Sequence, residues 1–153
     1  MSNGETGGPY IGAAFLCEKV LQEKDGVLSA IRIVDRILHN AVGPSAPDRM
    51  PPVTVDLKML LIFKSGSARG RYDVEIRPVL PSQRDLQSVS LPMQLEGDDD
   101  RGANLIVNIG FQATEEGLYW FDVLVRGDSV TRIPLRILYQ RVSVGTSGAT
   151  PVH

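Results

Sequence analysis

The chain offers few side chains that could act as a nucleophile with a base beside it. Its single cysteine, Cys17, stands in the apolar stretch AAFLCEKVL, and its only histidines are His39 and His153. A catalytic thiol needs a neighbouring base or cation that lowers its pKa. The sequence holds no HxxxH, CxxC or GxSxG pattern either. It therefore predicts a buried, reduced and inert thiol, no cofactor and no enzyme activity.

Two short charged segments could in principle bind an ion. Residues 96–102, EGDDDRG, concentrate three aspartates but lack the alternating Asp-x-Asp-x-Asp-Gly spacing with which calcium loops converge their oxygen ligands. Residues 64–71, KSGSARGR, form a basic Gly/Ser turn without the Gly-Lys-Ser/Thr of a phosphate-binding loop. Both segments are interpreted as solvated turns, and no metal site is predicted.

Residues 126–129 spell Arg-Gly-Asp-Ser, which resembles the integrin-binding tetrapeptide of cell-adhesion ligands. The same Gly-Asp pair is also what a tight hairpin connection between two strands needs. No secretory signal or cysteine pair accompanies it. We favour the hairpin interpretation and keep an adhesion ligand as the less favoured alternative.

The charge balance argues against two classes of partner. The net charge is −2, and no Lys/Arg-rich run is present, so nucleic-acid binding is disfavoured. The longest strongly apolar run, MLLIF at 59–63, is far too short to span a bilayer. The first ten residues lack the basic start and apolar stretch of a secretory signal. The sequence therefore predicts a cytoplasmic protein with neither a nucleic-acid nor a membrane partner.

Apolar residues alternate with polar ones along most of the chain, which is the pattern of half-buried strands. In GRYDVEIRPVL, for example, Tyr72, Val74 and Ile76 face one way and the charged residues the other. No segment carries a convincing helical stripe over three turns. The expected strands are 10–21, 26–38, 53–66, 70–80, 88–96, 103–113, 117–125 and 130–142.

About eight strands joined by short turns favour an all-β, two-sheet antiparallel sandwich of immunoglobulin-like architecture. One single domain is expected over residues 10–142. The segment 39–52 carries four prolines and is expected to be a loop. The Gly/Ser/Thr-rich ends, 1–9 and 143–153, are expected to be flexible tails.

The segment TEEGLYWF has the spacing of a tyrosine corner, a feature of immunoglobulin-like sandwiches. There a tyrosine at the start of a late strand bonds through its hydroxyl to backbone a few residues upstream. Glu115 and Gly117 would form the tight turn, and Tyr119 would be the corner tyrosine. The alternative is an ordinary turn before an aromatic-rich strand, since no Cys…Trp…Cys framework is present.

The pairing of the last two strands is predicted from the need to bury apolar side chains. A strict two-residue turn at 127–128 would pair Tyr119 with an arginine and place arginines inside. An odd-length loop, or a bulge near this turn, instead pairs Phe121 with Ile133 and Tyr119 with Leu135. Because a one-residue slip moves a whole strand to the other face, the second pairing is expected.

The same alternation sends a tryptophan to the outer face of this sheet, between leucines and arginines. Trp and Arg are the residue types that anchor protein interfaces. The alternative is that the N-terminal strands or the proline-rich loop cover this strip within one molecule. The predicted partner surface is Leu118, Trp120, Leu124, Arg132, Arg136 and Leu138.

Two long stretches, residues 9–37 and 115–137, resemble small bacterial proteins grouped as a family of unknown function. The positions that match its late-strand pattern are Gly117, Tyr119, Phe121, Val123, Gly127, Pro134, Leu135 and Ile137. The resemblance implies a β-sandwich of bacterial or phage origin. Its motifs are packing motifs, and the resemblance brings no activity with it.

Three classes of function therefore compete. The first is a non-enzymatic interaction or assembly module that binds a protein partner, or itself, through a sheet face. The second is a carbohydrate or other small-ligand module using the loops at one end, although the loops 39–52, 81–87 and 96–103 contain no aromatic residue. The third is a hydrolase, which the missing catalytic constellation makes least favoured.

Overall fold

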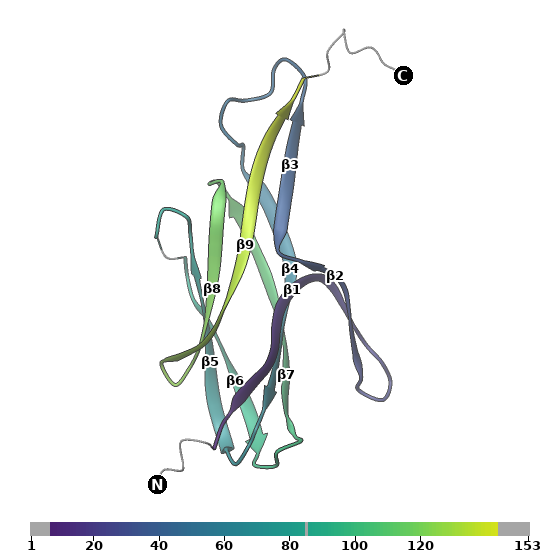
Figure 1. Cartoon of the computed structure of the whole chain (residues 1–153), viewed down its shortest axis with the longest axis vertical. Helices are drawn as coiled ribbons and strands as arrows, with labels where there is room; N and C mark the ends of the chain where they lie inside the picture. Colours follow the sequence, from purple (N-terminus) through teal and green to yellow (C-terminus); the bar gives the residue numbers. More distant parts are fainter. Residues whose placement is uncertain (1–6, 85, 144–153) are drawn as a thin grey trace.

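The computed structural model describes residues 7–84 and 86–143, and nine strands lie within them. They form two sheets packed face to face, drawn out along the strand direction (Figure 1). The strands are β1 (Tyr10–Gln22), β2 (Leu28–Val34), β3 (Arg36–Val42), β4 (Val53–Lys64), β5 (Arg69–Val79), β6 (Val89–Glu96), β7 (Gly102–Ala113), β8 (Gly117–Val125) and β9 (Asp128–Val142).

The predicted all-β, two-sheet sandwich is confirmed. One sheet has four strands in the order β2-β1-β4-β7, and the other has five in the order β3-β9-β8-β5-β6. Every pairing is antiparallel except that of β3 with β9, which is parallel. In Figure 1 these two strands extend together to one end of the molecule, while the β1–β2 hairpin projects sideways from the body.

The strand expected over 26–38 is wrong as a single element. The chain leaves the four-stranded sheet after Val34, which pairs with Leu16, and enters the other sheet at Arg36, which pairs with Arg136. The carbonyl of Asp35 accepts the first hydrogen bond of the new ladder, from the N–H of Arg136 at 3.0 Å. β3 then continues to residue 42, so the predicted loop at 39–52 begins four residues later than expected.

Alternating side chains of both sheets fill the space between them. The inward face of β4 carries Leu61 and Phe63, and the inward face of β8 carries Tyr119, Phe121 and Val123, all at most 1% exposed. Burying an apolar side chain of this size contributes about 1.5–3 kcal/mol to the free energy of unfolding. The side chains of β8 that alternation predicts to face the core are therefore the buried ones.

The ends of the ordered strands coincide with the predicted domain, since β1 begins at Tyr10 and β9 ends at Val142. Residues 7–9, assigned to a tail from the sequence, lie against the turn at 65–68. The carbonyl of Gly7 accepts hydrogen bonds from the N–H of Ser67 at 2.6 Å and of Ala68 at 3.1 Å. The rest of both predicted tails, 1–6 and 144–153, lies outside the described residues.

The register of β8 and β9 is the predicted one. Phe121 pairs with Ile133 and Tyr119 with Leu135, after a shift at Val123/Leu124 in which β9 carries one extra residue, Val130. The turn itself lies one residue earlier than expected. Val125 pairs with Asp128, so residues 126–127 form it, with φ of 53° and 83°. Two positive φ values mark the type I′ turn that matches the twist of a hairpin.

Tyr119 lies where the tyrosine-corner pattern places it. The side chain is 1% exposed, and its hydroxyl donates to the carbonyl of Glu115 at 2.8 Å and accepts from the N–H of Glu115 at 3.3 Å. Burial raises the pKa of Tyr119 above the ordinary tyrosine value of 10.0, although its hydrogen bond with Glu115 opposes that rise. The hydroxyl thus closes the backbone turn that feeds β8.

The carboxylate of Glu115 fixes the same corner to a second loop. Its oxygens accept hydrogen bonds from the N–H and hydroxyl of Ser82, both at 3.0 Å, and from the guanidinium of Arg84 at 2.9 Å. The contact with Arg84 holds the pKa of the Glu115 carboxyl below its usual value. The sequence assigned Glu115 to the turn only, and this tie to the loop after β5 was not predicted.

We expect Tyr119→Phe to lower the free energy of unfolding at neutral pH by about 1 kcal/mol, because one net hydrogen bond is lost. Because the pKa of Tyr119 is raised in the folded state, its protonated hydroxyl contributes its full stabilisation below the unfolded pKa, near 10. This stabilisation is lost as the pH rises through the higher pKa of the folded state. The difference between the two proteins should therefore shrink above about pH 10. Urea titrations across this range would measure it, and a difference independent of pH would contradict the assignment.

Candidate interaction surface

The outer face of the five-stranded sheet carries the predicted partner surface. Trp120 lies near the middle of this face, with Pro134 of β9 and Val79 of β5 as its Cα partners. Leu118 pairs with Arg136, one row further along. Trp120 is only half-buried, so neither the N-terminal strands nor the proline-rich loop covers it completely. Leu118, Arg136 and Leu138 are half-buried as well.

The Trp120 ring is covered in part by an arginine from the neighbouring strand. The guanidinium carbon of Arg132 lies 4.3 Å from the ring centroid, within the range of a cation–π contact. The same guanidinium donates to the carboxylate of Asp122 at 2.6 Å. Asp122 was missed as a member of this surface, although alternation from Trp120 and the predicted register would have placed it opposite Arg132.

Two arginines lie side by side at one end of this surface. Arg36 on β3 and Arg136 on β9 are register partners in a parallel pair and face outward together. Within the described residues neither side chain takes part in an ion pair, whereas Arg77 and Arg132 on the same face each do. Adjacent cations that form no ion pair repel one another, so this end of the surface favours an approaching negative charge.

Leu124 does not belong to the exposed surface, and its inclusion in the prediction was wrong. The side chain points outward but is only 7% exposed. It lies on a central strand, with Glu75 of β5 as its Cα partner on one side and Ser129 of β9 on the other, next to the bulge. Neighbours on both sides therefore enclose it. Leu124 therefore faces outward, as alternation predicts, and is nevertheless buried.

The Arg-Gly-Asp-Ser segment forms the β8–β9 hairpin, with its arginine bound to the protein itself. The guanidinium carbon of Arg126 lies 3.9 Å from the centroid of the Tyr72 ring, and Asp128 is already the first residue of β9. A cation–π contact of this kind holds the arginine against the sheet. The tetrapeptide therefore has a structural role in the hairpin.

Cys17 is fully buried, but on the outer side of the four-stranded sheet rather than in the core between the sheets. Its Cα partners are Ile33 and Lys58, and its thiol donates to the carbonyl of Lys19 at 3.5 Å. Burial raises the pKa of the Cys17 thiol. Across residues 7–84 and 86–143, no three His, Cys, Asp or Glu side chains come together as a metal site. No helix in the same ranges could cross a membrane.

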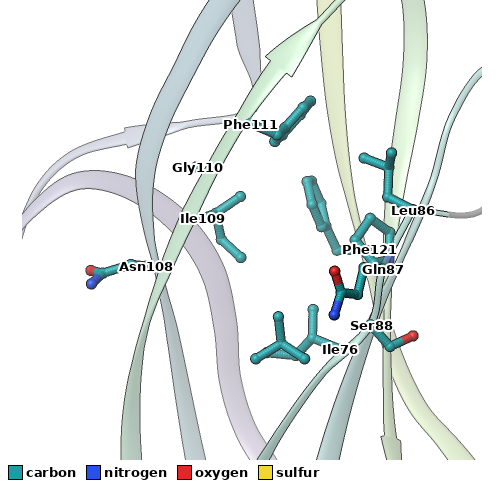
Figure 2. Close-up of a pocket in the computed structure, with 11 residues that line it drawn as sticks. Ile76, Leu86, Gln87, Ser88, Asn108, Ile109, Gly110, Phe111 and Phe121 are labelled. Carbon is teal, nitrogen blue, oxygen red and sulfur yellow. The ribbon is translucent and has the colours of Figure 1, made fainter.

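A pocket of about 490 Å³ opens between the two sheets along their free edges (Figure 2). On one side it is lined by β7, from Asn108 to Phe111, and on the other by residues 86–89, which lead into β6. Ile76 and Phe121, both 0% exposed, lie at its inner wall. This pocket was not predicted from the sequence, because it depends on the distance between the edge strands of two different sheets.

Comparisons relate the chain to one sequence family and to solved structures of low sequence identity. A model of a family of unknown function, DUF6941, matches residues 12–138. A search of curated proteins finds no match. Among solved structures, an immunoglobulin-like protein from Pseudomonas aeruginosa is 11% identical with a TM-score of 0.44, over 85% of this chain and 96% of that one. The alkylpurine DNA glycosylase AlkC from Pseudomonas fluorescens, solved with DNA containing an abasic-site analogue, is 9% identical with a TM-score of 0.39. That match covers 82% of this chain and 30% of the glycosylase.

We expect Cys17 to be unreactive in the folded protein, because only the thiolate attacks and burial disfavours it. A chromogenic disulfide reagent should label the protein slowly in buffer and stoichiometrically in denaturant. Rapid labelling without denaturant would mean that the thiol is accessible and would contradict the structure.

Asp128→Asn should leave association with cellular partners unchanged and lower the melting temperature only slightly. The hairpin depends on the two positive φ values at 126–127, which this substitution does not touch. Partner capture and thermal melts of both proteins would test this. Loss of a partner with the fold intact would support the adhesion interpretation instead.

Proposed function

The chain belongs to the family of unknown function DUF6941, and we propose that it is a non-enzymatic protein-interaction module. In this proposal it binds an acidic surface of a partner protein through the outer face of its five-stranded sheet. The observation that carries the proposal is a half-buried Trp120 under the guanidinium of Arg132. Two arginines of neighbouring strands lie on the same face and form no ion pair within the described ranges. A bacterial or phage assembly is the setting that we propose for it.

Trp120 and Arg132 supply the two residue types that most often dominate binding free energy. A partner that covers them would desolvate a large ring already fixed by its neighbour, so little side-chain entropy remains to be lost. Leu118 and Leu138 lie on the same face and are half-buried, which supports an apolar contact around the ring. The strands beneath are central ones, so the surface is rigid before the partner arrives.

The charge of the surface supports the choice of an acidic partner. Asp122 and Glu75 are already engaged, with Arg132 at 2.6 Å and with Arg77 at 3.2 Å. Arg136 forms no ion pair with either of them, or with another acid in the part of the chain that the structure describes. An interface carboxylate beside Arg136 would form a charge-assisted hydrogen bond and relieve the repulsion from Arg36.

We also propose a cytoplasmic location for this interaction. The support is the thiol of Cys17, which is buried and unpaired because the sequence contains a single cysteine. Proteins of reducing compartments commonly carry such unpaired thiols. Fractionation of cells that produce the native protein would check the location directly.

The test compares two variants of the surface with a matched control. Trp120→Ala should weaken association by roughly 30-fold or more, the effect of a hot-spot truncation of about 2 kcal/mol. Arg136→Glu should abolish binding of an acidic partner by charge reversal. Arg101→Glu makes the same reversal in the turn between β6 and β7, where Arg101 is 64% exposed, and should bind normally.

Quantitative capture from native lysate, with thermal melts of each variant, measures these effects together. The proposal requires partners that wild type and Arg101→Glu retain and that both surface variants lose, while the fold persists. A Trp120→Ala protein that is destabilised by about 3–5 kcal/mol would behave like a core truncation. If it still retained every partner, this surface would not be the working one.

A further inference from the structure

β7 is an edge strand without the features by which proteins usually protect such edges. It is twelve residues long and pairs with β4 on one side only. The pairing runs from Val53–Ala113 to Lys64–Gly102 without a register shift. Its sequence, GANLIVNIGFQA, contains neither a charged residue nor a proline. Natural edges are normally blunted by charge, proline, bulges or shortness, so a long regular edge of this kind invites another strand.

The other three edge strands differ from β7 in this respect. β6 has eight residues and contains Pro92, and β3 has seven and begins with Arg36. β2 has seven residues and is distorted at Arg32, where φ is 58°. Only β7, among the strands that the structure describes, combines length, regularity and an uncharged sequence.

The pocket between the sheets lies directly along the unpaired side of β7. Ile109 and Phe111 point into it from β7, as Figure 2 shows, and Ile76 and Phe121 lie across from them. Asn108 points away from it, toward its hydrogen bond with Lys58 at 2.7 Å on the outer face. The pocket is thus apolar on the β7 side, and every lining residue is uncharged.

Two features at the pocket fit an approaching peptide backbone. Gly110 is exposed, and a Cβ there would meet only the carbonyl of Val55, at 3.8 Å, so a second backbone can approach this part of the edge closely. Gln87 stands at the mouth, exposed and without a hydrogen-bond partner among the described residues. Its side-chain amide can both donate to and accept from a peptide unit.

We propose that β7 and this pocket form a binding site for an extended peptide strand whose alternate side chains are apolar. The peptide adds to the free edge of β7 through main-chain hydrogen bonds, and an apolar side chain enters the pocket between the sheets. Strand addition of this kind takes affinity from the backbone and specificity from the pocket. This site is separate from the outer face of the five-stranded sheet and does not depend on the function proposed for that face.

A single peptide strand fits this site better than a second copy of the chain paired through its own β7. In a second copy, the inward side chains of β7, such as Val107 and Ile109, are already buried in that copy's own core. They could not also fill the pocket of the first copy. A strand outside any sheet has both faces free, so its side chains can reach the inner wall.

The experiment titrates the ¹⁵N-labelled protein with a short peptide in which leucine alternates with threonine, and with a matched peptide in which aspartate replaces leucine. The leucine peptide should shift the amide signals of residues 106–111 and slow their hydrogen exchange, and the aspartate peptide should not. Val89→Asp should weaken binding about tenfold or more, because it sets an unpaired carboxylate at the pocket mouth. Val89 is 40% exposed, so the fold should tolerate the change.

Ser90→Asp is the matched control, since it adds the same charge to the adjacent residue of the same strand, outside the pocket lining, and should bind normally. Gln87→Glu, at an exposed position, repeats the test should Val89→Asp melt early. The proposal is overturned if the leucine peptide leaves residues 106–111 unperturbed, or if neither pocket variant weakens binding. It is also overturned if these amides are protected without peptide in proportion to protein concentration, since a second copy would then occupy the edge.

Discussion

One extra residue in β9 decides which side chains of the five-stranded sheet are inside and which are outside. With Val130 inserted opposite Leu124, the remainder of β9 presents Ile133 and Leu135 to the core. Without it, Arg132 and Arg136 would face the core, and each buried, unpaired guanidinium would cost several kcal/mol. The bulge therefore maintains the core and, in the same step, the array of arginines on the outer face.

This constraint could be read from the sequence because it is local. β8 and β9 are joined by two residues, so only a few registers exist, and the burial of apolar side chains selects one of them. The tyrosine corner is local in the same sense, because Tyr119 reaches Glu115 only four residues away. The register of β8 with β9 and the tyrosine corner together determine that Tyr119 faces the core and Trp120 faces outward.

The features that sequence reasoning missed depend on contacts between distant segments. The partly buried positions switch from even numbers, ending at Val34, to odd numbers, beginning at Ile37. Apolar residues stand on both faces of 26–38, however, so the sequence alone does not show this change of sheet. Leu124 alternates as an exposed residue would, yet its neighbours on β5 and β9 enclose it. The pocket along β7 depends on the distance between the edge strands of two sheets, which no local pattern specifies. Asp122 is a different case, because the predicted register already placed it beside Arg132 and it was overlooked.

The parallel pairing of β3 has a consequence for the order in which the protein can be assembled on the ribosome. β3 has β9 as its only neighbour in the sheet, and Leu38 pairs with Leu138, 100 residues later in the sequence. At about 5–20 residues per second, β3 waits roughly 5–20 s for its partner after it has been synthesised. During that interval β3 has no ladder, and β8, once synthesised, has no neighbour on its β9 side. Nascent chains halted before β9 should therefore be the ones that chaperones hold longest.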